Sequence, residues 1–223
     1  MKTSIRILVG IAFPLFFLAG TKAIACGNGK LILEDKFETL NPAWGFEAND
    51  PSRSNGTGGL VYKVKPGDGS LSQHNQSDLY DNYEVCAVFA TNVAENSSAW
   101  VGVRFWANDY NNTYQVNVFP FDGAYGLGRR KNGKWIFPIA ETPSDAIQKG
   151  TNVTNEISVT VNGNKATLAV NGKKITDYTG APPEGGSVFG FDLGIGDDDK
   201  GPATLTLKSI QLREVEGQAA ASH

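Results

Sequence analysis

Two tryptophans and an arginine alternate along one short segment of this 223-residue chain. Trp100, Arg104 and Trp106 are separated by even numbers of residues, so in an extended strand they share one face and project together. Indole rings stack on the apolar C–H faces of sugar rings, and a guanidinium donates hydrogen bonds to hydroxyl groups. Exposed tryptophans usually mark a surface that a ligand or partner covers. The pattern predicts a carbohydrate-binding surface. The alternative is that a loop of the chain covers one or both rings.

Polar side chains at matching positions extend this surface. Asn108 follows Trp106 on the same face, Gln115 and Asn117 alternate along the next segment, and Glu84 opens the polar side of residues 83–90. Ligand sites combine aromatic walls with a few polar groups that fix orientation. The predicted carbohydrate-binding residues are Glu84, Trp100, Arg104, Trp106, Asn108, Gln115 and Asn117.

A catalytic role is harder to assign from the residues. Hydrolysis of a glycosidic bond usually needs two carboxylates that flank it, and Glu84 is the only acid that the alternation places near Trp100. Asp109 closes the tryptophan-bearing strand, Asp192 belongs to a separate glycine-rich strand, and His74 lies in a polar segment where we expect a solvated loop. We therefore expect binding without catalysis and leave catalytic residues unassigned. The alternative is a glycoside-processing enzyme with Glu84 as acid or base.

Metal and cofactor chemistry finds little support in the motifs. Residues 196–201 place three aspartates in one turn, and Ca²⁺ prefers such oxygen-rich loops. Lys200 lies within that cluster and weakens the case, and an acidic hairpin tip is commonly just solvated. The chain has no dinucleotide, phosphate-loop or zinc motif. We expect neither a metal nor a cofactor.

The composition is that of a globular protein: 40% of the residues are hydrophobic and 19% are charged. The length fits one all-β domain. A formal net charge of -3 argues against a nucleic-acid partner, which usually requires a basic surface. Beyond the N-terminus no apolar run is long enough to span a membrane.

The N-terminus has the pattern of a secretory signal peptide. Lys2 and Arg6 precede the apolar run 7–19, and Ala23-Ile24-Ala25 matches the small-x-small cleavage site. We expect a signal peptide at 1–25, a domain at 26–216, a short disordered tail at 217–223, and a secreted or periplasmic location. Cys26 would then begin the mature chain. It could carry a lipid anchor, form a disulfide with Cys86, or stay free.

The remaining chain is a series of short strands without a convincing helix. Alternating apolar and polar residues, interrupted by turn signals about every ten residues, predict a β-sandwich rather than helices. Asn-Gly pairs at 132–133, 162–163 and 171–172 predict tight hairpins, and residues 155–178 should form a three-stranded meander. The predicted strands are 31–37, 60–64, 83–91, 99–107, 113–119, 124–130, 134–139, 156–161, 165–170, 173–178, 188–195 and 204–213.

The order of these segments resembles the concanavalin A-like jelly-roll superfamily, closest to the branch with laminin-G-like and 3-keto-disaccharide hydrolase-like domains. The resemblance rests on short pieces over most of residues 30–214. They are 33–37 with Trp44, 83–89, 101–105, 114–116, 155–159, 169–172 and 188–191.

This resemblance implies a two-sheet antiparallel jelly-roll sandwich that binds ligands on its concave face. It also implies that Glu84, Arg104 and Gln115 occupy concave positions. The paired acids of the hydrolase members are missing from this sequence. The predicted function is therefore an exported, non-catalytic carbohydrate-binding domain. The alternatives are a hydrolase of the 3-keto-disaccharide type and a structural envelope or adhesion module.

Overall fold

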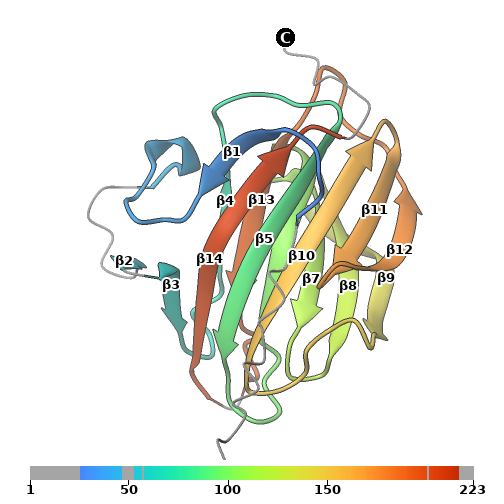
Figure 1. The fold of residues 1–223 in the computed structure, drawn as a ribbon. Helices are drawn as coiled ribbons and strands as arrows, with labels where there is room; N and C mark the ends of the chain where they lie inside the picture. Colours follow the sequence, from blue (N-terminus) through green and yellow to red (C-terminus); the bar gives the residue numbers. More distant parts are fainter. Residues whose placement is uncertain (1–25, 47–52, 57, 200, 216–223) are drawn as a thin grey trace, which may run out of the picture.

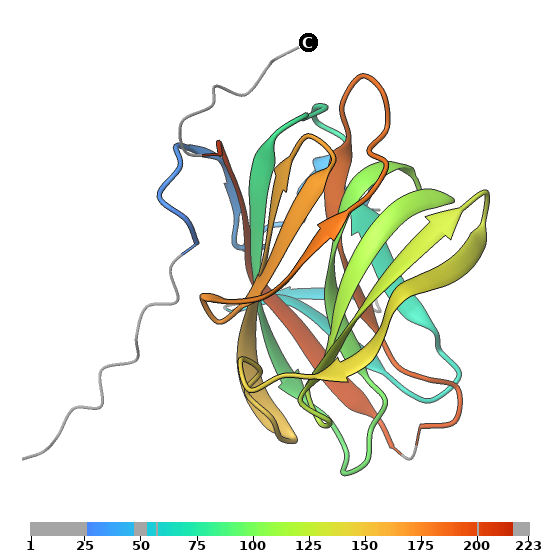
Figure 2. The same ribbon diagram turned by 90° about the vertical axis from the view of Figure 1, so that its right-hand side faces the viewer.

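The computed structural model describes residues 26–46, 53–56, 58–199 and 201–215. The expected signal peptide and C-terminal tail lie outside these residues. The described chain forms two antiparallel sheets packed face to face (Figures 1 and 2), which confirms the predicted jelly-roll sandwich. Its one helical element is the 3-10 turn η1 (Pro42–Trp44). Within the described residues, no helix has the length and apolarity that a bilayer crossing needs.

The first sheet has eight strands and contributes one half of the core. Its continuous order is β12 (Lys173–Thr179), β11 (Lys165–Val170), β10 (Asn152–Asn162), β5 (Tyr83–Asn92), β14 (Ala203–Arg213), β3 (Gly59–Val64) and β2 (Arg53–Gly56). The eighth strand, β1 (Leu31–Asp35), pairs with the end of β14 beyond the part that pairs with β3. The predicted meander of three strands is present as β10, β11 and β12.

The second sheet has six strands and carries the candidate site. Its order is β4 (Ser70–His74), β13 (Val188–Gly194), β6 (Trp100–Asp109), β7 (Asn112–Phe119), β8 (Ala124–Lys131) and β9 (Lys134–Pro143). One face of this sheet packs on the eight-stranded sheet through alternate residues such as Val101, Val103 and Phe105, all fully buried. The opposite face, called the open face below, carries the residues in between.

Most predicted strands match observed ones within a few residues, and the turns explain the exact register. Asn132-Gly133 and Asn171-Gly172 have positive φ at both residues and join two-residue hairpins as predicted. The third turn lies one residue later than expected, because Asn162 still pairs with Lys165. The prediction of a solvated loop around His74 is wrong, since Ser70–His74 forms the edge strand β4 beside β13.

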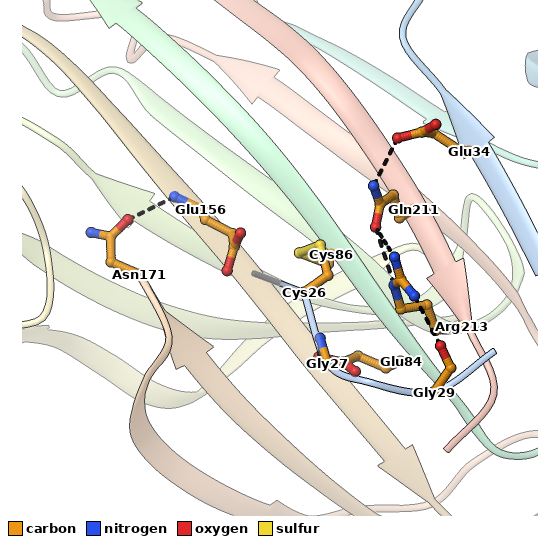
Figure 3. The surroundings of a disulfide bond; sticks show 10 residues. All are labelled: Cys26, Gly27, Gly29, Glu34, Glu84, Cys86, Glu156, Asn171, Gln211 and Arg213. Atoms are coloured by element: carbon orange, nitrogen blue, oxygen red, sulfur yellow. Dashed lines mark hydrogen bonds between the residues drawn. A yellow bond between two sulfur atoms is a disulfide. The ribbon is translucent and has the colours of Figure 1, made fainter. Parts of the chain in front are cut away.

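A disulfide between Cys26 and Cys86 fastens the start of the described chain to the central strand β5, with Cα atoms 5.8 Å apart. Figure 3 shows the segment after Cys26 crossing the outer face of the eight-stranded sheet. The Gly27 N–H donates to the Glu84 Oε1 atom at 3.2 Å, and Arg213 Nη1 donates to the Gly29 carbonyl at 2.9 Å. The structure thus selects the disulfide among the three alternatives for Cys26. A lipid anchor, which would need its sulfur, is not supported.

Candidate functional site

The open face brings together side chains from four neighbouring strands through the register of the six-stranded sheet. Ser72, Asp192 and Asn117 lie in one row across the sheet, with Gly102 between the last two. Arg104 and Gln115 lie opposite each other in the next row. Trp100 is two residues from Gly102 on the same strand and therefore on the same face. The alternation read from the sequence accordingly places Trp100, Arg104, Gln115 and Asn117 together.

These side chains surround a cavity of about 300 Å³. Its walls come from β4, β13, β6, β7, β8 and β9, and from the β6–β7 turn. This volume lies at the lower end of the range for small-molecule sites and suits one or two sugar rings. The lining residues are Ser70, Trp100, Arg104, Tyr110, Gln115, Asn117, Phe119, Gly128, Trp135, Phe137 and Asp192.

Asp192 lies at the centre of a hydrogen-bond network in the polar part of the cavity. Its carboxylate accepts hydrogen bonds from Arg104 Nη2 at 3.0 Å and from Gln115 Nε2 at 2.8 Å. The Ser72 hydroxyl and the Trp100 indole N–H also donate to it. Asp192 and Arg104 are almost completely buried, so their charges are paired out of water. Such a network fixes the rotamers of the groups around it.

Arg104 and Gln115 nevertheless keep polar atoms without protein partners. Arg104 is 1% exposed, yet its Nε and Nη1 atoms have no hydrogen-bond partner. Gln115 uses its amide nitrogen toward Asp192 and toward Asn117 Oδ1 at 2.7 Å, while its Oε1 atom is unpartnered. Buried polar groups in native proteins are normally satisfied. Three buried polar atoms on two cavity-lining residues are thus left without a protein partner.

Aromatic rings form the opposite wall. Trp135 and Phe137 alternate on β9 and stack nearly parallel, with ring centroids 6.3 Å apart and an interplanar angle of 14°. Phe137 is 70% exposed, and Tyr110 and Trp135 are also exposed. Aromatic surface left uncovered beside a cavity is typical of a binding site.

Glycines on the open face make room for two of the rings. A Cβ atom at Gly194 would overlap the six-membered ring of Trp100, and one at Gly128 would lie 3.0 Å from Trp135 Cζ3. Both indoles therefore lie directly over bare main chain. Larger residues at these two positions would displace the rings.

His74 lies beside this network on the edge strand β4. Its neighbour across the ladder, Gly190, pairs in turn with Arg104. Burial, together with the positive charge of Arg104, lowers the pKa of His74 to about 4, although Asp109 acts in the opposite direction. The imidazole is therefore neutral at pH 7, and its Nε2 atom is buried without a partner.

Trp106 does not share the face of Trp100 and Arg104, and the sequence-based placement is wrong. The pairing of β6 with β7 shifts between Phe105 and Asp109, and Trp106 has a positive φ of 45°. This irregularity breaks the period of two, so the indole turns inward. Trp106 is 2% exposed and packs at 5.2 Å from Tyr114, ring centroid to ring centroid.

Glu84 and Asn108 also lie away from the cavity. Glu84 is on β5 in the other sheet, where it faces the segment after Cys26 (Figure 3), so its predicted placement beside Trp100 is wrong. The alternation correctly put it opposite the core, but it could not say which sheet the strand joins. Asn108 is exposed and lines a separate cavity of about 170 Å³ next to Trp106.

Acidic residues outside the cavity, among them Asp199 of the acidic turn singled out in the sequence, are engaged in local structure. Asp35 accepts from the Trp44 indole N–H at 2.9 Å and from the Phe37 N–H at 2.7 Å. Asp199 accepts from the Ser97 hydroxyl at 2.8 Å and from the Ser98 N–H at 2.6 Å. A hollow of about 580 Å³ lies beside residues 34–42, but its described lining contains no aromatic ring. These acids stabilise loops.

Sequence reasoning missed part of the site. Trp135 and Phe137 were within a predicted strand and two residues apart, which was a usable signal for a shared face. Tyr110 lies in a turn, and Asp192 reaches the cavity only through strand order. No local sequence pattern indicates which strands become neighbours in a sheet.

Comparisons with known proteins agree with this fold. Residues 24–214 match the model of the 3-keto-alpha-glucoside-1,2-lyase-like domain. A comparison with curated proteins by sequence gave no match.

Solved structures resemble the chain in fold at low sequence identity. The carbohydrate-binding module CBM66 from Bacillus subtilis is 14% identical with a TM-score of 0.56, over 74% of this chain and 92% of the module. The catalytic domain of a laminarinase from Thermotoga petrophila is 10% identical with a TM-score of 0.60, over 85% of this chain and 99% of that domain. A Bacillus licheniformis β-glucanase is 13% identical with a TM-score of 0.54, over 85% of this chain and 100% of the glucanase.

Proposed function

The chain belongs to the 3-keto-alpha-glucoside-1,2-lyase-like domain family, and we propose that the cavity on its open face binds a carbohydrate. The observation that carries this proposal is the pairing of an exposed aromatic wall with buried polar atoms that lack protein partners. A sugar ring has an apolar face for Trp135 and Phe137. Its hydroxyl groups can accept from Arg104 and donate to Gln115.

Each side chain then has a defined role in binding. Trp135 and Phe137 provide the stacking surface, and Trp100 closes the other end of the cavity while donating its N–H to Asp192. Asn117 accepts from the Gln115 amide nitrogen, which leaves Gln115 Oε1 without a protein partner and able to accept from a ligand hydroxyl. Because Asp192 already accepts four hydrogen bonds, we assign it to positioning Arg104, Gln115 and Trp100. The pre-set rotamers reduce the entropy lost on binding.

Calorimetric titration of the oxidised protein with a panel of neutral and acidic oligosaccharides tests the proposal. Trp135→Ala should weaken binding by roughly 1–3 kcal/mol, the value of a large apolar contact. Ile136→Ala is the matched control, because Ile136 lies on the same strand, is also exposed and does not line the cavity. Absence of binding across the panel, or equal effects of the two substitutions, would contradict the proposal.

A glycoside-processing activity is the second candidate. The observation that favours it is His74, a neutral imidazole with an unpartnered Nε2 atom beside Arg104. A neutral imidazole is in the protonation state of a general base, and a pKa of about 4 makes it a weak one. A two-carboxylate hydrolysis has less support, since Asp192 is the only carboxylate among the described residues of the cavity lining. Turnover of a glycoside that is lost in His74→Asn, with binding retained, would establish this activity.

We also propose that the protein is exported to a secreted or periplasmic location. The Cys26–Cys86 disulfide supports this, because such bonds persist in oxidising compartments. The signal-peptide pattern before Cys26 points the same way. Mass spectrometry of the mature protein would test it: a chain that begins at Cys26 with an intact disulfide is expected, and retention of residues 1–25 would contradict cleavage.

A further inference from the structure

The guanidinium groups of Arg104 and Arg130 lie over the same two aromatic rings, those of Tyr110 and Trp135. The Cζ atoms of Arg104 and Arg130 lie 5.1 and 4.2 Å from the ring centroid of Tyr110. The same two atoms lie 6.0 and 5.9 Å from the ring centroid of Trp135. Arg104 lines the cavity of about 300 Å³, whereas Arg130 contacts two of its lining rings and itself lines the neighbouring cavity of about 170 Å³.

The described lining of the cavity holds one carboxylate, and a second, Asp109, directly precedes the lining residue Tyr110 in the chain. Asp192 pairs with Arg104 at 3.0 Å and is the sole carboxylate in the described lining. Arg130 donates its Nε atom to the Gly133 carbonyl at 3.1 Å, and within the described part of the chain no carboxylate forms an ion pair with it. Arg130 therefore has no ion-pair partner among the described residues.

Arg104 supplies the second, independent observation. It is almost completely buried and lines the cavity, and its Nε and Nη1 atoms have no partner. Buried donors without acceptors cost free energy, and charged guanidinium donors bond most strongly to anionic oxygens. Neutral hydroxyl groups would satisfy these donors but would leave Arg130 without an ion-pair partner.

We propose that the carbohydrate bound here carries an oxyanion, a carboxylate or a sulfate, placed between Arg104 and Arg130. This inference rests on the proposed carbohydrate binding and names the class of sugar. The aromatic wall contacts the ring face, and Gln115 Oε1 accepts from a hydroxyl of the same ring. Burial and then the charge of Arg104 keep the neighbouring His74 neutral, while Asp109 is the opposing charge that acts on that imidazole.

The test compares matched ligands on the oxidised protein by calorimetry. A glucuronic acid-containing disaccharide is compared with its methyl ester, which keeps the ring and removes the charge, and a sulfated glucose disaccharide is compared with its unsulfated parent. We expect at least one acid to bind about tenfold or more tightly than its neutral counterpart, with affinity that falls as salt increases. The acid that binds more tightly than its neutral counterpart shows whether the oxyanion is a carboxylate or a sulfate.

Arg130→Gln should remove most of the preference for the acid while leaving the affinity for the neutral ligand within about twofold. Arg129→Gln is the matched control, because Arg129 is adjacent on β8 and stacks on a tyrosine, Tyr114, on the opposite side of the sheet. Equal binding of acids and neutral counterparts would overturn this inference and leave carbohydrate binding standing. A protein that binds none of these ligands, nor any other saccharide, would overturn both.

Discussion

The buried pair of Arg104 and Asp192 allows a quantitative test of the structure. In Asp192→Asn the side chain keeps its shape but loses its charge, and one of its oxygens becomes an NH₂ group. That group would point either at the donors Ser72 and Arg104 or at the donors Trp100 and Gln115. The substitution therefore leaves the buried guanidinium of Arg104 without its counter-charge. It also places the new NH₂ group, a donor, against two side chains that are themselves donors.

The expected cost follows from these contacts. Removing one partner of a buried ion pair destabilises proteins by about 3–5 kcal/mol, because the remaining charge stays out of water. Asp192 and Arg104 are both within 2% of full burial, so solvent screening gives little relief. For a domain of this size, each kcal/mol lowers the Tm by about 2–4 °C. The Tm of Asp192→Asn should fall by about 6–20 °C.

Urea unfolding followed by tryptophan fluorescence measures this change, and the midpoint should shift while the slope with denaturant stays constant. Asp145→Asn is the matched control. Asp145 also pairs with a cation, Lys173, but the pair is exposed, so its loss should not move the midpoint measurably. If Asp192→Asn unfolds at the same urea concentration as Asp145→Asn, Asp192 and Arg104 are not the buried pair described here.

Trp106→Ala should lower the free energy of unfolding by about 3–5 kcal/mol, the cost of emptying a packed aromatic site. Its glycan affinity should match that of the wild type, and a fully stable variant would contradict the burial of Trp106. Serine at both Cys26 and Cys86 should cost about 2–4 kcal/mol in urea unfolding, because the disulfide closes a loop with a sequence separation of 60; an unchanged midpoint would argue against the bond. Burial and the nearby charge of Glu84 raise the pKa of Glu156 from 4.5 to about 7, so the folded state holds a proton that the unfolded chain releases. Stability should therefore fall as pH rises from about 4.5 to 7, and a Glu156→Gln variant that kept this slope would refute the assignment.

The fold could be read from the sequence because its signals are local. Alternation along a strand such as β6 and Asn-Gly pairs such as 132–133 act within a few residues. The strand β4 was not predicted because Ser, Gln and His dominate it and Leu71 is its one apolar residue. An edge strand held by main-chain hydrogen bonds to β13 leaves little trace in composition.

The site was only partly predictable, for two physical reasons. Period-two alternation assigns residues to a face only while the ladder is regular, and the shift after Phe105 turns Trp106 inward. Alternation also says nothing about which sheet a strand joins. Glu84 and Arg104 both oppose the core, yet they end on opposite outer surfaces, whereas Asp192 reaches Arg104 through the pairing of β13 with β6. Strand order is a property of the whole chain.

The glycines of the open face also bear on how this protein could acquire new specificity. At Gly102 and Gly190 an added methyl group would meet main-chain oxygens of neighbouring strands, so those positions resist change. Gly126 differs, because a Cβ atom there would lie 3.5 Å or more from every neighbour, including the Phe119 ring. Selection or design could therefore vary position 126, which lies beside the cavity-lining ring of Phe119, without repacking the hydrophobic interior.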